Sequence, residues 1–595
     1  MLSPDSRAVA MDLLKPPPGY RLERTVLTTY SLDLEVLLAL PLAVLAQTDA
    51  GVEQLLLDPL VLLEAIREAG ERIQVFVDEA GIAVPANSRA LYGALESSVH
   101  QVKAPNGGAF HPKVWVARFV RENEPPLIRV SVASRNLTFD RSWDIALTSE
   151  ATPGKKTIAA SKPLSDLLRR LPGLGDETLD DAVIAGIQQL ADEVQRTAFP
   201  APEGFDSGLE FHVLGFGKQK GHWSPVEQAT RVLAIAPFLS DKALQKIASL
   251  ASSESLLVSR ADQLSQLEVD LAKDWSLVQV LSPTADGEAE DGSQLRPSGL
   301  HAKLMVFEHG HRASWFVGSA NLTDAAFTGR NVEVMASASG PKGCAGGKGI
   351  GINLFMESGF LRLCEDYQPS EYTPEEETAQ EAATKLKQVR DALLGAELLV
   401  SFRPVENDWQ MAVQGEIALP QGVTLTAWPL SVEGHQAKKW QDGVSWHLPI
   451  ARLTAFIAFS IAVDGHDERL DLAIKLPVEG MPEERIHHVL RTLIDSPERF
   501  MQFLRALLGG LEEIAGLIGA SSGQTWNFAG GQGLRGEPLL EGMLRAASRD
   551  PQRLLPVRRL IADLRQSEEG RKIVPDDLYV VWQVVDSVLN DMEAQ

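Results

Sequence analysis

Phe110-His111-Pro112-Lys113 and, 190 residues later (301 − 111), Leu300-His301-Ala302-Lys303 are two copies of one short pattern in a chain of 595 residues. Each copy is followed, after an apolar run, by a second element. This element is Ala133-Ser134-Arg135-Asn136-Leu137-Thr138 after the first copy and Gly318-Ser319-Ala320-Asn321-Leu322-Thr323 after the second. A pattern that recurs at this distance within a similar order of elements indicates a duplicated domain rather than a solenoid.

Predicted strands and helices alternate around both copies, which indicates an α/β layer structure. Around the first copy we expect strands at 24–30, 72–77, 113–119 and 128–133 and helices at 33–47 and 61–69. Around the second copy we expect strands at 229–236, 255–259, 275–281, 302–308 and 313–318 and a helix at 240–250. The turn Asn106-Gly107-Gly108 is expected to close a hairpin before the first copy.

The remaining third of the chain has a different pattern. An acidic helix is expected at 375–394, followed by short alternating strands at 398–404, 409–417, 424–427, 445–448 and 455–463. Helical spacing of apolar residues then recurs at 489–508, 539–546, 554–564 and 577–592. We therefore predict a first lobe at 1–175, a second lobe at 176–370, a helical linker at 371–395, a small β-domain at 396–482 and an all-α C-terminal domain at 483–595.

The composition is that of a globular protein, with 44% hydrophobic and 23% charged residues. The longest apolar stretch, 36–46, is too short to cross a bilayer and is expected to form a buried helix. No segment resembles a signal peptide, and two cysteines exclude a disulfide framework, so we expect a cytoplasmic protein that does not bind membranes. The net charge of −24 argues against general attraction to nucleic acid and requires any such binding to use a confined groove or a partner.

The residue types of the repeated pattern suit a phosphodiester. One imidazole can attack phosphorus to give a phosphohistidine, and a second can protonate the leaving oxygen. Lysine and asparagine side chains can stabilise the charge on the other phosphate oxygens. If His-x-Lys lies in a strand, its two side chains point to the same side of the sheet and face one phosphate. His309 and His311, in a polar turn, are expected to be solvated rather than to bind a metal.

The two segments resemble the phospholipase D superfamily, whose signature is HxK(x)4D followed by a Ser/Asn element. The second copy matches better, through Phe316–Thr323 and Asn331-Val332-Glu333. The aspartate of the signature is absent, and Arg118 and Glu308 stand in its place. This departure favours the His-Lys-Asn form of tyrosyl-DNA phosphodiesterase and of bacterial phospholipase D-like nucleases over lipid hydrolases.

The resemblance covers about residues 25–365. It implies two lobes with mixed sheets flanked by helices, related by a pseudo-twofold axis, and one shared active site without metal or cofactor. One histidine would be the nucleophile and the other the general acid; the resemblance favours His111 as nucleophile and leaves the order open. Glu333, and less securely Asp144, hold the place of an acid that orients an imidazole. The catalytic residues it implies are His111, Lys113, Asn136, His301, Lys303, Asn321 and Glu333, and those expected to bind substrate are Ser134, Ser319 and Asp144.

The favoured function is that of a nuclease that acts on DNA rather than RNA. The resemblance further implies a place in a bacterial restriction or anti-phage defence system, with a helicase or another protein of that system as partner; a homo-oligomer stays open. Two alternatives remain: a phospholipid phosphodiesterase or transferase, and an inactive scaffold subunit that binds nucleic acid.

Overall fold

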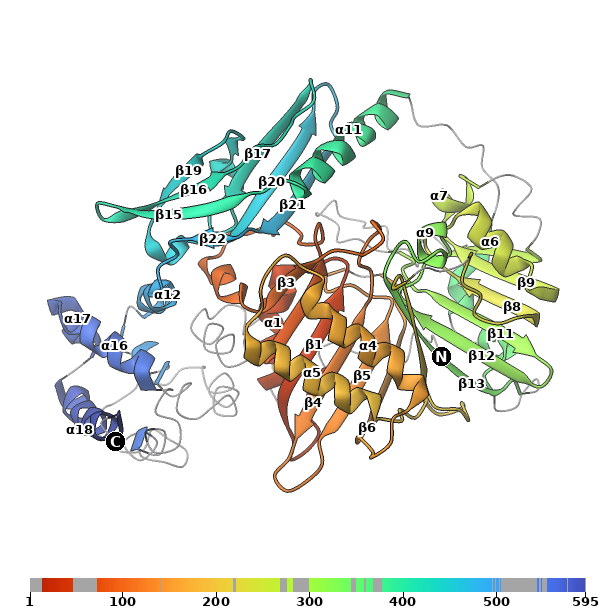
Figure 1. Ribbon diagram of the computed structural model, residues 1–595, viewed down its shortest axis with the longest axis horizontal. Helices are drawn as coiled ribbons and strands as arrows, with labels where there is room; N and C mark the ends of the chain where they lie inside the picture. Colours follow the sequence, from red (N-terminus) through yellow and green to blue (C-terminus); the bar gives the residue numbers. More distant parts are fainter. Residues whose placement is uncertain are drawn as a thin grey trace.

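The computed structural model contains two large sheets, a pair of smaller sheets and a set of C-terminal helices (Figure 1). It describes residues 13–45, 72–140, 142–217, 221–267, 275–281, 299–343, 349–357, 360–367, 377–494, 496–497, 499–501, 503–504, 543–544, 547, 554–574 and 576–593. The helix predicted at 61–69 lies outside these residues, and those predicted at 489–508 and 539–546 are described only in part.

The first sheet has the strand order β3-β2-β1-β4-β5-β6. Its strands β1, β2 and β3 are parallel, and each strand from β4 to β6 is antiparallel to its neighbour. The bounds are β1 Arg21–Thr29, β2 Ile73–Asp78, β3 Val99–Val102, β4 Val114–Val120, β5 Leu127–Ala133 and β6 Ala146–Ala151. The helices of this region are α1 Leu34–Leu45, η2 Ala90–Leu95, η3 Ala159–Ser161, α4 Lys162–Arg170, η4 Leu171–Gly173 and α5 Asp181–Gln195.

The second sheet repeats this pattern with one extra strand at each edge. Its order is β14-β10-β9-β8-β11-β12-β13-β7, and β8, β9 and β10 are parallel while β11 to β13 alternate. The bounds are β7 Glu210–Leu214, β8 Ala229–Ile235, β9 Ala251–Ser259, β10 Leu277–Leu281, β11 Leu304–His309, β12 Arg312–Gly318, β13 Glu333–Pro341 and β14 Cys364–Asp366. The helices are α6 Asp241–Ala248, α7 Ala261–Leu264, α9 Asp324–Phe327, α10 Ile352–Met356 and η6 Leu361–Leu363.

One hydrophobic core joins the two sheets. It contains Val116 and Val130 of the first sheet, Val306 and Val317 of the second, and Ile187 of α5. Helices α4 and α5 lie across one face of the first sheet, and α1 packs in a different core with side chains such as Leu27 and Phe119. This shared core fixes the position of one sheet relative to the other, and with it the relative position of the two repeated motifs.

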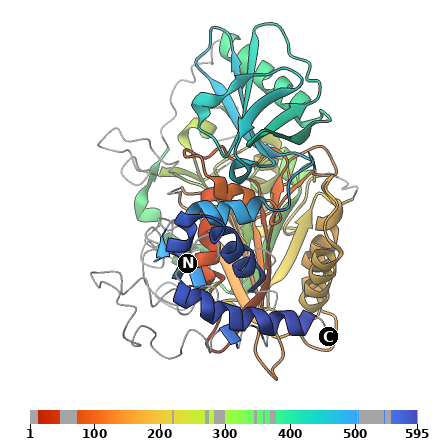
Figure 2. The same ribbon diagram turned by 90° about the vertical axis from the view of Figure 1, so that its left-hand side faces the viewer.

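A sandwich of two four-stranded sheets follows α11 (Glu377–Leu394), in agreement with the predicted β-pattern. The sheets have the orders β19-β16-β15-β22 and β18-β17-β20-β21. The bounds are β15 Leu399–Val405, β16 Asp408–Gln414, β17 Val423–Pro429, η7 Gly434–Gln436, β18 Lys438–Lys439, β19 Val444–Leu448, η8 Ile450–Arg452, β20 Phe456–Val463, β21 Arg469–Lys475 and β22 Val478–Glu479. Figure 2 shows this sandwich above the first sheet.

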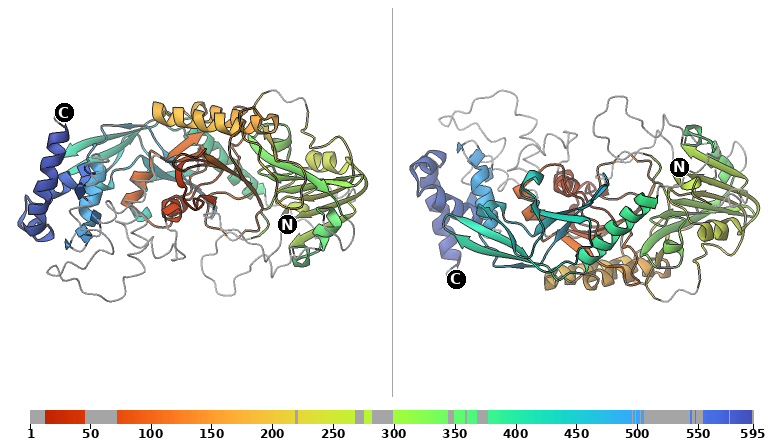
Figure 3. Two further views of the ribbon diagram at one scale, coloured as in Figure 1. Left: turned by 90° about the horizontal axis from the view of Figure 1, so that it is seen from below. Right: turned by 90° about the horizontal axis from the view of Figure 1, so that it is seen from above.

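The C-terminal helices α12 (Arg485–Leu493), α16 (Leu555–Leu564), α17 (Glu568–Ile573) and α18 (Asp576–Glu593) lie at the opposite end of the molecule from the second sheet (Figure 3). Their apolar side chains, including Leu490, Leu560 and Val585, share a core with the first sheet and α1. The stretch 36–46, predicted to be a buried helix, is largely α1, and Leu37, Leu38 and Leu40 are buried. Among the described helices, none combines the length and the apolarity needed to cross a membrane.

Candidate active site

Both repeated motifs lie at the edge of a sheet where one strand ends and the next begins. His111 and Lys113 directly precede β4, and Ser134 and Asn136 directly follow β5. Because β4 and β5 are antiparallel, the start of one lies beside the end of the other. The same holds for the second motif at β11 and β12.

The condition that His-x-Lys lies in a strand, under which both side chains would point to one side of the sheet, is met in neither copy. The strands begin one residue after each lysine, at Val114 and Leu304. The reason is that the histidine segments pair across the molecule instead of within their own sheets. Phe110 forms a parallel bridge with Val332, and Leu300 forms one with Trp143.

These cross-pairings follow the same rule on both sides. The His111 N–H donates to the Val332 carbonyl at 3.0 Å, and the His301 N–H donates to the Trp143 carbonyl at 3.0 Å. Each histidine is thus hydrogen-bonded to the residue that precedes the acid of the other motif, Glu333 or Asp144. The backbone therefore brings each imidazole to the acid of the opposite sheet.

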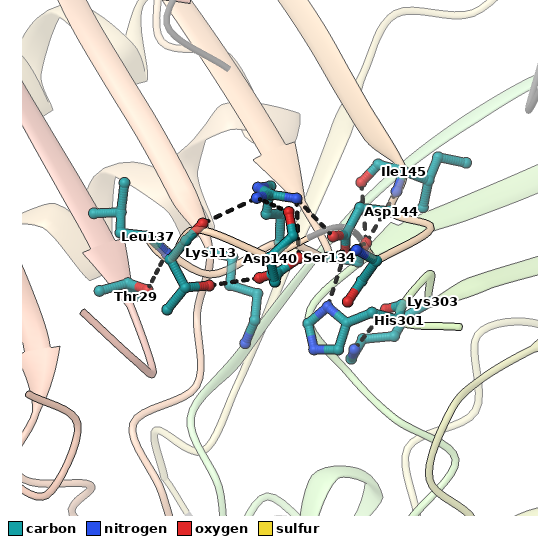
Figure 4. Close-up of polar contacts among 12 residues, drawn as sticks. Thr29, Lys113, Ser134, Leu137, Asp140, Asp144, Ile145, His301 and Lys303 are labelled. Atoms are coloured by element: carbon teal, nitrogen blue, oxygen red, sulfur yellow. Dashed lines mark hydrogen bonds and ion pairs between the residues drawn. The ribbon is translucent and has the colours of Figure 1, made fainter. Parts of the chain in front are cut away.

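The side chains pair across the two motifs in the same way as the backbone. The His111 ring contacts Glu333 through Nδ1 and Oε2 at 2.9 Å, and the His301 ring contacts Asp144 through Nδ1 and Oδ1 at 2.8 Å. Figure 4 shows the His301 contact beside Lys113 and Lys303. A carboxylate accepts the proton of Nδ1 and so leaves the Nε2 lone pair of a neutral imidazole available. The structure gives Asp144 the same position as Glu333, although the sequence placed it less securely.

Each carboxylate is held by the serine of its own motif. Ser134 Oγ donates to Asp144 Oδ1 at 2.7 Å and accepts the N–H of Ile145 at 3.0 Å. Ser319 Oγ likewise donates to Glu333 Oε2 and accepts the N–H of Val334. Both serines are fully buried, so their hydroxyls fix the carboxylates in place.

Lys113 and Lys303 are buried ammonium groups, 0% and 1% exposed. Lys113 Nζ donates to the His111 carbonyl at 3.1 Å, and Lys303 Nζ donates to the His301 carbonyl at 2.8 Å. Among the described residues, no carboxylate lies within salt-bridge distance of either ammonium. Buried charged groups are usually paired, so an anionic ligand between these two lysines would provide the partner that the described carboxylates do not.

The lysine pKa values reflect this environment. Burial and the repulsion of Lys303 lower the pKa of Lys113 well below its usual value. Burial lowers the pKa of Lys303 to about 8, although Asp144 and Glu333 oppose the change. An anion near both would favour their protonated forms and reverse these shifts.

The imidazoles and carboxylates take complementary protonation states. Burial lowers the pKa of His111 to about 4, and Lys113 and Lys303 reinforce this effect against the attraction of Glu333. Burial also lowers the pKa of His301, against the hydrogen bond to Asp144. For Glu333, burial acts to raise the pKa, but His111 and Lys113 bring it below its usual value. At neutral pH, His111 is therefore neutral and Glu333 is ionised.

Asn136 and Asn321 each have a buried side-chain oxygen that accepts no hydrogen bond from the described residues. A buried polar atom without a partner is rare and requires an explanation. A rotation of 180° about the bond to the amide group exchanges the positions of Oδ1 and Nδ2. Either atom can therefore face a ligand at this position.

Three side chains near the site were not singled out from the sequence. The Tyr30 ring lies 5.1 Å from the His111 ring, centroid to centroid. Asp78 accepts the N–H of Phe110 at 2.7 Å, and Arg135 lies 3.5 Å from Asp144. Arg135 lies inside the motif quoted above. Tyr30 directly follows β1 and Asp78 is the last residue of β2, and these positions indicate closeness to the site only when the order of the strands in the sheet is known.

The two positions that depart from the superfamily signature lie away from the histidines. Arg118 forms ion pairs with Glu193 of α5 and Glu23 of β1. Glu308 is 3% exposed, accepts the N–H of Ile352 at 2.7 Å and lies 3.5 Å from Arg231. Both side chains thus connect elements of the fold. Within the described ranges, no group of three or more His, Cys, Asp or Glu side chains is arranged to hold a metal ion.

The turn at Asn106–Gly108 does not close a hairpin, because β3 and β4 are not neighbours in the sheet. Instead, the Asn106 side chain donates to the carbonyls of Gly215 and Gly329 at 3.1 and 2.8 Å. A side chain on Gly108 would overlap the Arg330 carbonyl, at 2.4 Å. The turn therefore joins the first motif to the second sheet and supports the cross-pairing at His111.

Comparisons with known proteins give a distant result. No protein-family model and no curated protein sequence matches the chain. Among solved structures, yeast tyrosyl-DNA phosphodiesterase matches with 12% identity and a TM-score of 0.33 over 56% of this chain and 87% of that one. A histidine-to-arginine mutant of tyrosyl-DNA phosphodiesterase 1 from yeast matches with 12% identity and a TM-score of 0.35, over 55% and 84%. At TM-scores this low, the likeness supports no conclusion about fold or function.

Proposed function

We propose that the chain is a phosphodiesterase that hydrolyses DNA through a phosphohistidine, without a metal ion. The observation that carries this proposal is the pair of exchanged histidine–carboxylate contacts, at 2.9 and 2.8 Å, beside two buried lysines that no carboxylate of the described residues contacts. We propose further that the two sheets belong to lobes 1–175 and 176–370, related by a pseudo-twofold axis through this site.

The first step uses the neutral state of His111. Its Nδ1–H donates to Glu333, so the Nε2 lone pair can attack phosphorus. A P–N bond forms while the bond from phosphorus to the leaving oxygen breaks. His301, held through Nδ1 by Asp144, donates its Nε2 proton to that oxygen. His301 is the more exposed imidazole, with a side chain 22% exposed against 12% for His111, which suits it to exchange protons with solvent.

The second step reverses these roles. A water molecule gives a proton to His301 Nε2 and attacks phosphorus, the P–N bond breaks, and the product is a phosphate monoester. In both steps we assign to the buried Lys113 and Lys303 the stabilisation of the negative charge that develops on the phosphate oxygens, and to the amides of Asn136 and Asn321 further polar contacts. The bound anion raises the pKa of His301 and so supplies the proton that the first step requires.

The functional test is hydrolysis of single- and double-stranded DNA, RNA and phospholipid vesicles by the full chain in EDTA. We expect cleavage of DNA that survives chelation, and losses of roughly 10³-fold or more in His111→Ala and in His301→Ala. An acid-labile adduct that joins His111 to the DNA through phosphorus should accumulate when His301→Gln slows hydrolysis of the P–N bond. His309→Ala, at an exposed position outside the site, is the matched control and should retain the parent rate.

Three outcomes would contradict the proposal: cleavage at the parent rate in His111→Ala, activity only after a metal ion is added, or release of a lipid headgroup instead of nucleotides. Binding of DNA without cleavage would favour the scaffold alternative. The role in a defence system beside a helicase remains a prediction, which co-purification of the tagged chain from its native cells would test.

A further inference from the structure

Two exposed side chains, Phe238 and Arg260, lie at the same edge of the second sheet as the second motif. Phe238 follows β8 by three residues, and Arg260 directly follows β9. Since β8 and β9 are parallel neighbours, their C-terminal ends meet at one edge. β11 is antiparallel to β8 and begins at that edge, directly after Lys303. The topology therefore places the pair beside the phosphate site.

Backbone contacts tie Phe238 to the second motif. The next residue, Leu239, forms a parallel bridge with Leu322, and the Ser240 N–H donates to the Leu322 carbonyl at 2.8 Å. Leu322 directly follows Asn321, whose amide has an unpaired buried oxygen. Phe238 is thus positioned by the same segment that carries a predicted phosphate contact.

The two side chains combine an exposed aromatic ring with a neighbouring cation. Phe238 is 41% exposed, and it is the one aromatic among the exposed large hydrophobic residues of the described ranges. The Arg260 guanidinium lies 5.8 Å from its ring centroid and is held by Asp262, with Nε donating to Oδ1 at 3.0 Å. Exposed aromatic rings next to arginine are the means by which proteins stack on unpaired bases.

The first sheet has no aromatic at the equivalent position. There Leu32 bridges Leu137, and the Asp33 N–H donates to the Leu137 carbonyl at 2.8 Å, so Leu32 corresponds to Leu239. Phe238 therefore corresponds to Ser31. The repeated framework does not require an aromatic residue here, and packing does not explain one that is left exposed.

We infer that Phe238 and Arg260 form a stacking platform for one nucleobase next to the scissile phosphate, and that the substrate is therefore single-stranded. This inference rests on the proposed function, which supplies the phosphate. In a duplex, neighbouring base pairs cover the faces that stacking needs. The net charge of −24 also disfavours the backbone contacts on which duplex binding depends, whereas stacking does not require a basic surface.

Binding of short fluorescent nucleic acids to the full chain, measured by anisotropy in a His111→Ala background so that metal-independent hydrolysis does not consume the probe, tests this inference. The hydrolysis comparison uses the protein with His111 intact. Phe238→Ala should weaken the affinity for oligo(dT) by roughly 5- to 150-fold, the range found for losing one aromatic–base stack. Phe238→Trp should retain the affinity. An abasic strand of equal length, which keeps the phosphates and lacks the bases, should bind the parent and Phe238→Ala equally. Hydrolysis of bis(p-nitrophenyl) phosphate should not change, because Phe238 does not act on the phosphate.

Val405→Ala is the matched control, since Val405 is 38% exposed and lies in β15 of the sandwich. It should leave every measurement unchanged. An unchanged oligo(dT) affinity in Phe238→Ala, an equal loss for the abasic strand, or a parallel loss for duplex DNA would each overturn the inference. If the parent hydrolyses no diester and Phe238→Ala still weakens binding of oligo(dT) but not of the abasic strand, the proposed function fails, and the stacking site is retained as a site that binds a base without cleavage.

Discussion

Glu333 and Asp144 do not touch the phosphate in the proposed mechanism, yet each fixes the tautomer of one histidine. Ser319 and Ser134 in turn fix the carboxylates. Each imidazole is therefore oriented by a carboxylate that a buried serine in turn holds in place. Positioning of this kind adds to the rate in proportion to how well it keeps Nε2 directed at the phosphorus or the leaving oxygen.

Removing the charge of these carboxylates should lower activity without abolishing it. We expect Glu333→Gln and Asp144→Asn each to reduce kcat by about 10- to 100-fold, because the amide keeps the shape and loses the charged acceptor. The KM for a small diester should change little, since the lysines remain. Steady-state kinetics measures both. An increase in KM with kcat unchanged would instead show that these residues bind substrate, as first predicted for Asp144.

The lowered pKa of Lys303 gives anion binding a definite dependence on pH. Below about pH 8 the ammonium is charged and attracts an anion, and above about pH 8 it is neutral. Affinity for tungstate, a tetrahedral anion that keeps its charge over this range, should therefore fall as the pH rises from 7 towards 10. Calorimetric titration at several pH values measures this.

Lys303→Arg provides the comparison, because a guanidinium stays protonated throughout. In this variant, tungstate affinity should depend on pH less steeply than in the parent. An identical slope in both proteins would assign the titration to another group, such as Lys113, whose pKa is also lowered.

At the level of strands and helices, the fold follows from local pattern to a large extent. Apolar alternation predicted β4, β5, β8, β11, β12 and β20 to within a few residues. The predicted start of β4 at Lys113 was too early, because the segment before Val114 pairs with the second sheet and not with its own. Likewise, the sequence identified Glu333 and Asp144 but could not assign each to a histidine. Those contacts join residues 222 and 157 positions apart and depend on how the sheets pack.

Arg118, which stands where the phospholipase D signature has an aspartate, has a structural role in this fold. It joins β4 to α5 through Glu193 and to β1 through Glu23, and it is 9% exposed. Arg118→Ala would leave Glu193 buried without its partner, so we expect a loss of about 3–5 kcal/mol in the free energy of unfolding. Urea denaturation measures it. The surface variant Arg121→Ala should stay within about 0.5 kcal/mol of the parent.

At the scale of the whole molecule, the C-terminal third is packed against the first sheet. Ala473 of β21 bridges Ile82, and Arg485 of α12 donates to Glu96 and to the Gly93 carbonyl, both at 2.9 Å. Lys475 Nζ donates to the carbonyls of Glu96 and Val99. The sandwich and α12 therefore cover apolar surface that the first sheet would otherwise expose.

Breaking this interface should destabilise the parts on both sides of it. Arg485→Ala leaves Glu96 without its buried cation, and we expect a loss of about 3–5 kcal/mol in unfolding free energy. Hydrogen exchange should increase in β3 and in β21 together. Arg469→Ala, at a side chain 69% exposed, should change neither quantity. Faster exchange confined to α12 would show that the interface contributes little to the first sheet.

Each histidine contacts the carboxylate of the other motif, so the site cannot be completed until both motifs have been synthesised. A nascent chain that has emerged through residue 140 already carries His111 and Lys113, but the acid that orients His111 is Glu333. The His111 imidazole, the nucleophile of the proposed mechanism, is thus without its orienting partner until almost 200 further residues have left the ribosome (333 − 140 = 193). Under the proposed function, the growing polypeptide would become able to hydrolyse a diester only late, when the second sheet packs against the first.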